Sequence, residues 1–99
     1  MEINRIEDNG KVTFQLDGWL DTAAAPELGK AVESLTSASE IVLDFEKVEY
    51  IASSGLRQVV ACYKKAKEFG AAYKLVNVRP EVMNIFKMTG LDKKINIEG

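Results

Sequence analysis

The stretch from Ile41 to Val60, IVLDFEKVEYIASSGLRQVV, places a strand pattern directly before a helix pattern. Its first apolar run, Ile41 to Phe45, is too short for an independent helix and is rich in branched and aromatic residues, as strands covered on both faces are. Further on, apolar residues follow the spacing of one helix face, at Leu56, Val59, Val60 and Tyr63. This order of patterns indicates an α/β fold with parallel strand pairing.

Two adjacent serines mark the junction between these patterns. Ser53 and Ser54 lie where the helix begins, and a serine there can accept hydrogen bonds from the unpaired N–H groups of the first turn. Capping explains one serine and does not necessarily explain both.

Length and charge limit the classes of partner. The 99 residues, 46% of them hydrophobic, suit one compact domain over residues 1–99. Thirteen basic and fifteen acidic residues leave a net charge of −2, which supplies no general attraction to nucleic acid or to an anionic membrane. We therefore expect neither direct nucleic-acid binding nor membrane association.

The residue inventory also argues against catalysis. The chain has no histidine, which excludes a Ser-His-Asp triad, a Cys-His pair and any histidine-ligated metal. Asp17 and Asp21 are close in sequence, but loop carboxylates beside a strand are more often turn formers than a catalytic pair. We expect no catalytic residue, no metal and no cofactor. The single cysteine and the lack of a signal-peptide pattern favour a cytoplasmic location.

The first half of the chain predicts a hairpin followed by a helix. Alternating residues indicate antiparallel strands over residues 2–7 and 11–17, joined by a tight turn at Asn9-Gly10. Asp17-Gly18 is expected to end the second strand. Helical spacing then predicts a helix over residues 23–36, with Thr22 as its cap.

The second half predicts alternating strands and helices. We expect strands at 40–45 and 73–78 around a helix at 54–69 that Gly70 ends, with a right-handed crossover that makes the strands parallel. A helix over 80–89 and a short edge segment complete the chain. The fold class is therefore α/β, with a mixed sheet of four or five strands packed with helices. The predicted core comprises Phe14, Leu28, Val32, Val42, Leu43, Leu56, Val60, Leu75 and Phe86.

Three stretches together resemble one family. They are GWLDTAAAPEL (Gly18 to Leu28), IVLDFEKVEYI (Ile41 to Ile51) and SSGL (Ser53 to Leu56). In this order they resemble a STAS domain, and specifically a bacterial anti-sigma factor antagonist (anti-anti-sigma factor). The similarity covers essentially the whole chain, and its most specific part is the strand, turn and SSGL helix start.

The resemblance implies a partner-switching protein. In such proteins a serine at the start of the second helix is phosphorylated by a partner that is both a serine protein kinase and an anti-sigma factor, and a phosphoserine phosphatase reverses the modification. The matching residue is Ser53. The unphosphorylated antagonist binds the anti-sigma factor and thereby frees the sigma factor, and phosphorylation breaks that contact. The resemblance further implies partner contacts at Asp21, Thr22, Ala52, Ser54, Gly55, Leu56 and Arg57.

The chain departs from the best-known members at one position. Those members have aspartate directly before the phosphorylated serine, where this chain has Ala52. An alternative function therefore stays open, as a STAS subunit of a stress-signalling, transporter or lipid-trafficking complex without phosphorylation. Purely structural roles also remain possible for three of these residues. Asp21 can form a turn, Gly55 can fit a tight first helical turn, and Arg57 can be an ordinary solvated side chain.

Overall fold

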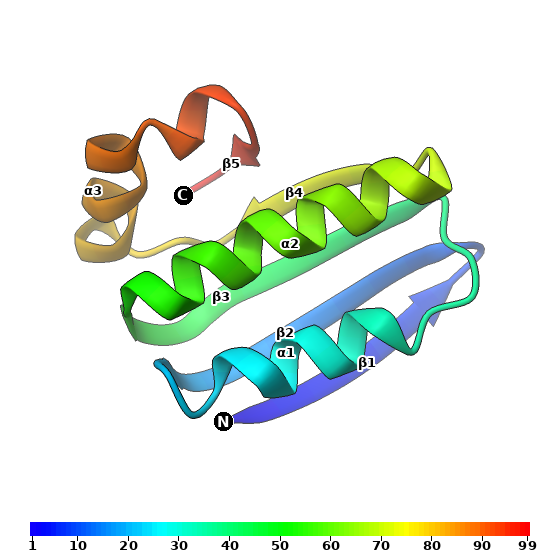
Figure 1. The fold of residues 1–99 in the computed structure, drawn as a ribbon, viewed down its shortest axis with the longest axis horizontal. Helices are drawn as coiled ribbons and strands as arrows, with labels where there is room; N and C mark the ends of the chain where they lie inside the picture. The colour runs from blue at the N-terminus through cyan, green and yellow to red at the C-terminus, as the bar shows by residue number, and fades with distance from the viewer.

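A computed structural model describes residues 1–99, and its elements alternate between strands and helices (Figure 1). The strands are β1 (Glu2–Asp8), β2 (Lys11–Leu20), β3 (Glu40–Ile51), β4 (Ala72–Val76) and β5 (Asn96–Ile97). The helices are α1 (Ala25–Glu33), α2 (Ser53–Phe69) and α3 (Pro80–Thr89), with a short 3-10 helix, η1 (Leu91–Lys93). The five strands form one sheet in the order β1-β2-β3-β4-β5. Only the β1–β2 pair is antiparallel, so the predicted mixed α/β sheet is confirmed.

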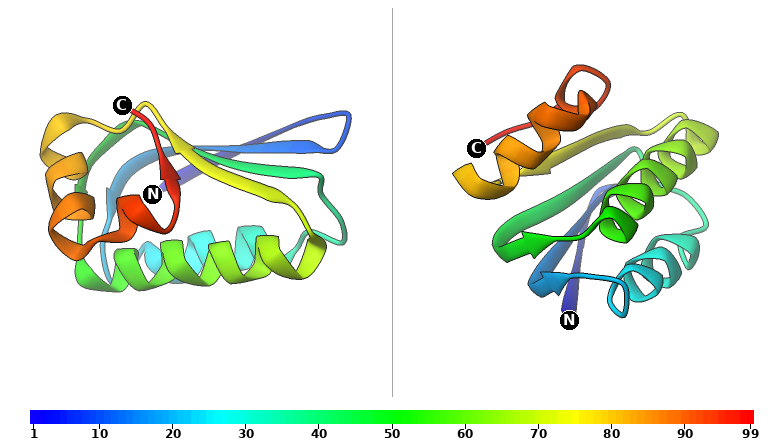
Figure 2. Two further views of the ribbon diagram at one scale, coloured as in Figure 1. Left: turned by 90° about the horizontal axis from the view of Figure 1, so that it is seen from above. Right: turned by 60° about the vertical axis from the view of Figure 1, so that its left-hand side comes forward.

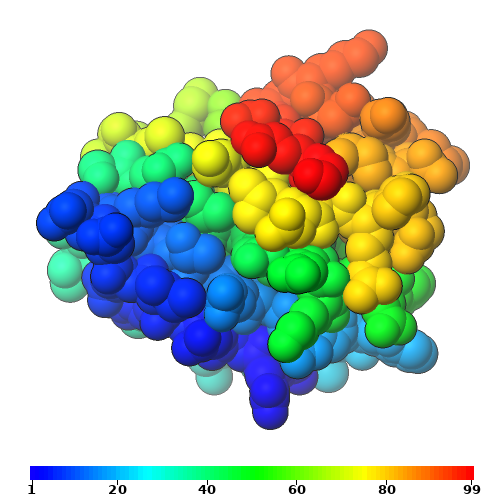
Figure 3. Space-filling model, turned by 180° about the vertical axis from the view of Figure 1, so that it is seen from behind, coloured from blue at the N-terminus to red at the C-terminus, as the bar shows by residue number.

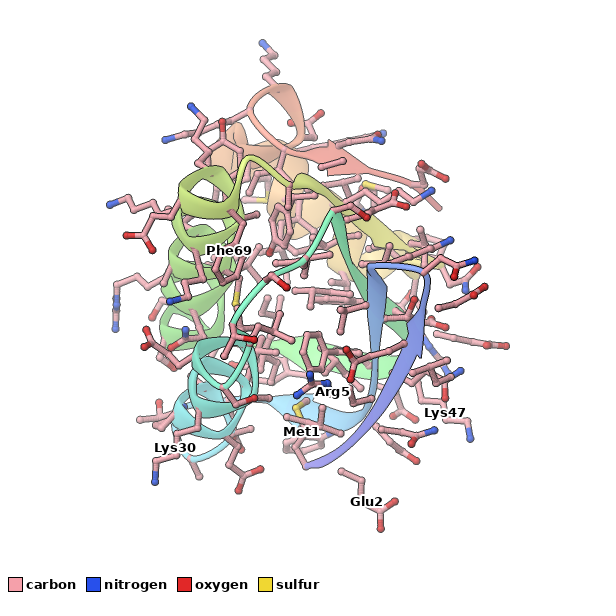
Figure 4. All side chains as sticks on the ribbon, turned by 90° about the vertical axis from the view of Figure 1, so that its right-hand side faces the viewer. Met1, Glu2, Arg5, Lys30, Lys47 and Phe69 are labelled. Carbon is pink, nitrogen blue, oxygen red and sulfur yellow. The ribbon has the colours of Figure 1, made fainter.

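The two long layers of the fold are the sheet and a pair of helices. Helices α1 and α2 lie side by side on one face of the sheet, while α3 packs at one end (Figure 2). Figure 4 shows the layers edge-on, with Lys30 of α1 and Phe69 of α2 on the helix side and Lys47 of β3 on the opposite side. No helix layer covers that opposite side, where atoms of β1 to β4 reach the surface (Figure 3). The core therefore fills the space between the sheet and the helices.

Both central strands are longer than predicted. The prediction that Asp17-Gly18 ends β2 is wrong, because β2 continues to Leu20 with Gly18 at a φ of 126° inside the strand. Strand β3 runs to Ile51 instead of residue 45. Its register with β2 shifts twice, since Asp44 and Lys47 face Gln15 and Asp17, and one more residue is inserted before Tyr50. These insertions, which have the character of β-bulges, interrupt the alternation that a sequence pattern depends on.

Helix α1 is shorter than predicted, and Thr22 is not its cap. The helix begins at Ala25 after an N-cap residue, Ala24, that makes no side-chain cap hydrogen bond. The turn before it is closed by Asp21, whose Oδ1 accepts a hydrogen bond from the N–H of Ala24 at 2.9 Å. The predicted turn-forming role of Asp21 is therefore what the structure shows.

Helix α2 buries a face that shares only Val59 with the predicted one. Its buried residues are Gly55, Val59, Cys62 and Ala66, whereas Leu56 and Val60 are only partly buried. Small side chains on the buried face allow the helix axis to approach the sheet closely. The other predicted core residues are buried, and Val42 is buried outside the main core cluster.

The last third of the chain closely follows the prediction. Strand β4 ends at Val76, two residues before the predicted end, and pairs in parallel with both β3 and the short edge strand β5. Helix α3 has the predicted bounds. Gly70 and Gly90 adopt left-handed conformations, with φ of 67° and 77°, directly after α2 and α3. Such glycines satisfy the last helical carbonyl groups and end the helices.

Candidate functional site

The candidate site lies where the carboxyl ends of β2 and β3 meet the start of α2. The carbonyl oxygen of Leu20, the last residue of β2, accepts a hydrogen bond from the N–H of Ala52 at 3.0 Å. This bond joins the end of β2 to the residue between β3 and α2. In sheets with parallel strands, binding surfaces form at the carboxyl ends of the strands, where loops and helix starts converge.

Ser53 is the exposed first residue of α2. The residue before it, Ala52, is in extended conformation with φ −90° and ψ 170° and has no side-chain atom that can accept a hydrogen bond. No side chain caps the helix, so the capping role considered for the serines is not realised. The first-turn N–H groups and the positive end of the helix dipole therefore lie beside an exposed hydroxyl group.

A second contact brings the turn before α1 to the start of α2. The Thr22 Oγ1 and Ser54 Oγ atoms are 3.1 Å apart, and either hydroxyl group can be the donor. Since Asp21 closes the same turn, the Thr22–Ser54 contact joins the turn that holds Asp21 and Thr22 to the residue directly after Ser53. These four predicted residues therefore form one continuous surface region.

The remaining predicted residues occupy the first turn of α2 and differ in exposure. Arg57 is exposed and forms no ion pair, whereas Leu56 is partly buried against the core. Gly55 is buried, and a Cβ atom there would lie 2.5 Å from the carbonyl oxygen of Leu20 and 2.9 Å from Cγ1 of Ile51. Glycine at this position lets the helix start touch the strand ends directly. The predicted contact between Gly55 and a partner stays a prediction.

The sequence interpretation missed an exposed aromatic pair beside these residues. Trp19 on β2 and Tyr50 on β3 face each other in the register, with ring centroids 5.7 Å apart and exposed fractions of 61% and 47%. The sequence pattern could have indicated the exposure of Trp19. If β2 is continued past Gly18, Leu16 and Leu20 face the core and Trp19 faces the opposite side. The prediction ended the strand at Asp17, so this alternation was not extended to Trp19.

No group of three or more potential ligands is placed to hold a metal ion. Burial raises the pKa of the only thiol, that of Cys62, to about 12, so this group is protonated at neutral pH and unsuited to nucleophilic attack. Asp17 lines a shallow groove of about 680 Å³ on the open face of the sheet, and Asp21 does not line it. No helix is long and apolar enough to serve as a membrane span.

Comparison with known proteins found one matching family and several similar proteins. The family model described as the STAS domain matches residues 2–99. The chain is 27% identical over 92 residues to the anti-sigma-B factor antagonist of Bacillus subtilis, which covers 92% of this chain and 84% of that protein. It is 28% identical over 97 residues to the anti-sigma-B factor antagonist of Listeria monocytogenes, covering 93% and 85%. The crystal structure of an anti-sigma factor antagonist from Mycobacterium paratuberculosis superposes with a TM-score of 0.87 at 25% identity, covering 98% of this chain and 84% of that one.

Proposed function

Because the chain belongs to the STAS domain family, we propose that it is an anti-sigma factor antagonist that phosphorylation of Ser53 releases from its partner. Its nearly full-length similarity to two anti-sigma-B factor antagonists supports the antagonist role. The exposure of Ser53 on an uncapped helix start, with neighbouring residues from two segments of the chain, supports the choice of this serine. The role is regulatory binding and not catalysis.

The position of Ser53 makes phosphorylation compatible with folding. A phosphate at the helix start would face unpaired N–H groups and the positive end of the dipole, which stabilises it by about 0.3–1 kcal/mol. The surface, however, gains about 1.5–2 negative charges where the partner would dock. The modification therefore changes binding without unfolding the domain.

The partner in this proposal is an anti-sigma factor that is also a serine protein kinase. The Ser53 hydroxyl oxygen attacks the γ-phosphorus of ATP bound to the kinase, ADP leaves, and a base of the kinase takes the hydroxyl proton. A phosphoserine phosphatase returns the serine by hydrolysis. This chain contributes the acceptor hydroxyl and the docking surface, and the exchange takes place in the cytoplasm.

Intact-mass measurement after incubation with the purified kinase and ATP tests the proposal. We expect one added phosphate on the original protein, none on Ser53→Ala, and one on Ser54→Ala, which is the matched control in the same helix turn. In a binding assay with ADP, Ser53→Ala should bind and Ser53→Asp should bind more weakly. Equal binding by Ser53→Asp and the original protein would refute the switch.

Ala52 favours a second candidate function. Without the aspartate of the best-known switch members, the domain could act as an unphosphorylated subunit of a stress-signalling, transporter or lipid-trafficking complex. The same mass measurement separates the two functions, because the subunit role predicts a stable complex and no added phosphate.

A further inference from the structure

We propose that Trp19 and Tyr50 form an aromatic anchor that binds a positively charged face of the same kinase partner. The inference rests on the function proposed above and extends the docking surface from the start of α2 to the ends of β2 and β3. It assigns a role to two residues that lie within the family-like stretches but that the resemblance leaves without a function.

The two rings lie together on the open side of the sheet. Leu16, Leu20 and Ile51 belong to the core under the helices, so Trp19 and Tyr50, on the other side of their strands, point away from α1 and α2. The tilted pair, with 60° between the ring planes, keeps most of the indole surface open to solvent. Such rigid, amphipathic rings are enriched among residues that dominate binding energy.

The aromatic pair is continuous with the surface around Ser53. Tyr50 precedes Ser53 by three residues, which span at most about 10 Å of extended chain. The Leu20–Ala52 hydrogen bond holds the two strand ends beside the helix start. A standard interface covers about 800 Å² on each partner, a disc roughly 30 Å across. An interface of that size centred between Ser53 and Tyr50 can therefore include both rings.

The charges around the rings specify the partner's chemistry. Residues 17–22 and 46–52 carry four carboxylates, Asp17, Asp21, Glu46 and Glu49, and one ammonium group, Lys47. The guanidinium group of Arg79 also lies here, because its Nε donates a hydrogen bond to the carbonyl oxygen of Glu46, and the surface remains negative by two charges. A cationic side chain that stacks on Trp19 would also approach these carboxylates, and the planar guanidinium group of arginine suits both contacts. We therefore assign an arginine-bearing face of the kinase to this surface.

At Ser53, unlike at the aromatic anchor, the partner presents negative charge. For transfer to occur, the kinase must place the phosphates of its nucleotide against the Ser53 hydroxyl group. A phosphoserine there meets like charge and is repelled, while the aromatic anchor still meets the basic face. The anchor thus supplies affinity, and Ser53 supplies control.

Binding of the purified kinase with ADP to matched variants tests the inference. Trp19→Ala and Tyr50→Ala should each weaken binding by about tenfold or more, and Trp19→Phe should lose less because it keeps an aromatic face. Ile6→Ala, which truncates another exposed apolar residue on β1, should bind as the original protein does. Thermal melts establish that each variant is folded.

The fluorescence of Trp19, the only tryptophan, gives a second readout in the original protein. Burial by the kinase should shift its emission to shorter wavelength, and added salt should weaken binding. Unchanged emission in the complex, or full affinity of Trp19→Ala, overturns the inference. If Ser53→Asp loses binding while Trp19→Ala keeps it, the aromatic anchor is wrong and the switch stands. If the original protein does not bind the kinase, both proposals fail.

Discussion

The carbonyl oxygen of Leu20 accepts the N–H of Ala52 at 3.0 Å, and it is also the atom that a side chain at position 55 would strike. One backbone oxygen thus ties β2 to the residue before α2 and limits how α2 can begin. The start of α2, which carries Ser53, is positioned by backbone contact with the strand ends.

The two helical glycines should respond in opposite directions to alanine. Gly55→Ala should lower the free energy of unfolding by about 1–3 kcal/mol, because its Cβ would lie 2.5 Å from a backbone oxygen that is fixed in the sheet. Gly29→Ala meets only the flexible amide of Gln58 at 2.9–3.0 Å, and it gains up to about 1 kcal/mol of helix propensity. Urea denaturation of both variants measures this contrast. A stability loss for Gly29→Ala as large as that for Gly55→Ala would contradict it.

Ala52→Asp should stabilise the domain. Ala52 occupies the N-cap position in extended conformation, and an aspartate there can accept hydrogen bonds from the first-turn N–H groups. We expect a gain of about 0.5–2 kcal/mol in the free energy of unfolding at neutral pH. Ala52→Asn, which caps without a full charge, is the control that separates hydrogen bonding from the dipole effect. No gain in either variant would show that the side chain cannot reach these groups.

Two adjacent valines test which face of α2 is buried. Val59 is fully buried, so Val59→Ala should cost about 1.5–3 kcal/mol through lost apolar burial. Val60 is partly exposed, and alanine's higher helix propensity offsets part of its loss, so Val60→Ala should cost less than about 1 kcal/mol. Denaturation midpoints measure both. The reverse order would show that Val60, the valine of the predicted core, is the buried one.

Alkaline pH should destabilise the domain partly through Cys62. Burial raises the pKa of its thiol from an ordinary 9.0 to about 12, so between these values the unfolded chain loses a proton that the folded chain keeps. Stability from this group is therefore complete below pH 9 and declines by about 1.4 kcal/mol per pH unit up to about pH 12. Cys62→Ala should show a shallower decline, measured by denaturation at several pH values.

Part of the decline should remain in Cys62→Ala. Burial also raises the pKa of the Tyr73 hydroxyl group, which donates a hydrogen bond to the carbonyl oxygen of Val59 at 2.9 Å. The direction of the effect is the same, because the folded state again holds a proton that the unfolded state releases. If the free energy of unfolding falls equally steeply with pH in Cys62→Ala and in the original protein, the thiol does not contribute to the alkaline destabilisation.

Local features of this fold could be predicted from the sequence because a few neighbouring residues determine them. Asn9 and Gly10, with φ of 49° and 85°, form the predicted hairpin turn, and Gly70 and Gly90 end their helices as predicted. The resemblance placed Ser53 at a helix start, where the structure also has it. These backbone preferences act within one turn of chain and need no distant contact.

Tertiary contacts decided the rest. The added residues in β3 are defined only by pairing with β2, and the helix face buried in α2 depends on how closely Gly55 lets the helix approach Leu20. The packing of these segments also brings Trp19 into contact with Tyr50, and Thr22 into contact with Ser54. The residues in each of these two contacts are about thirty positions apart in the sequence. Sequence periodicity reports which residues share a face, but the position of that face against another element depends on packing between segments that the pattern does not relate.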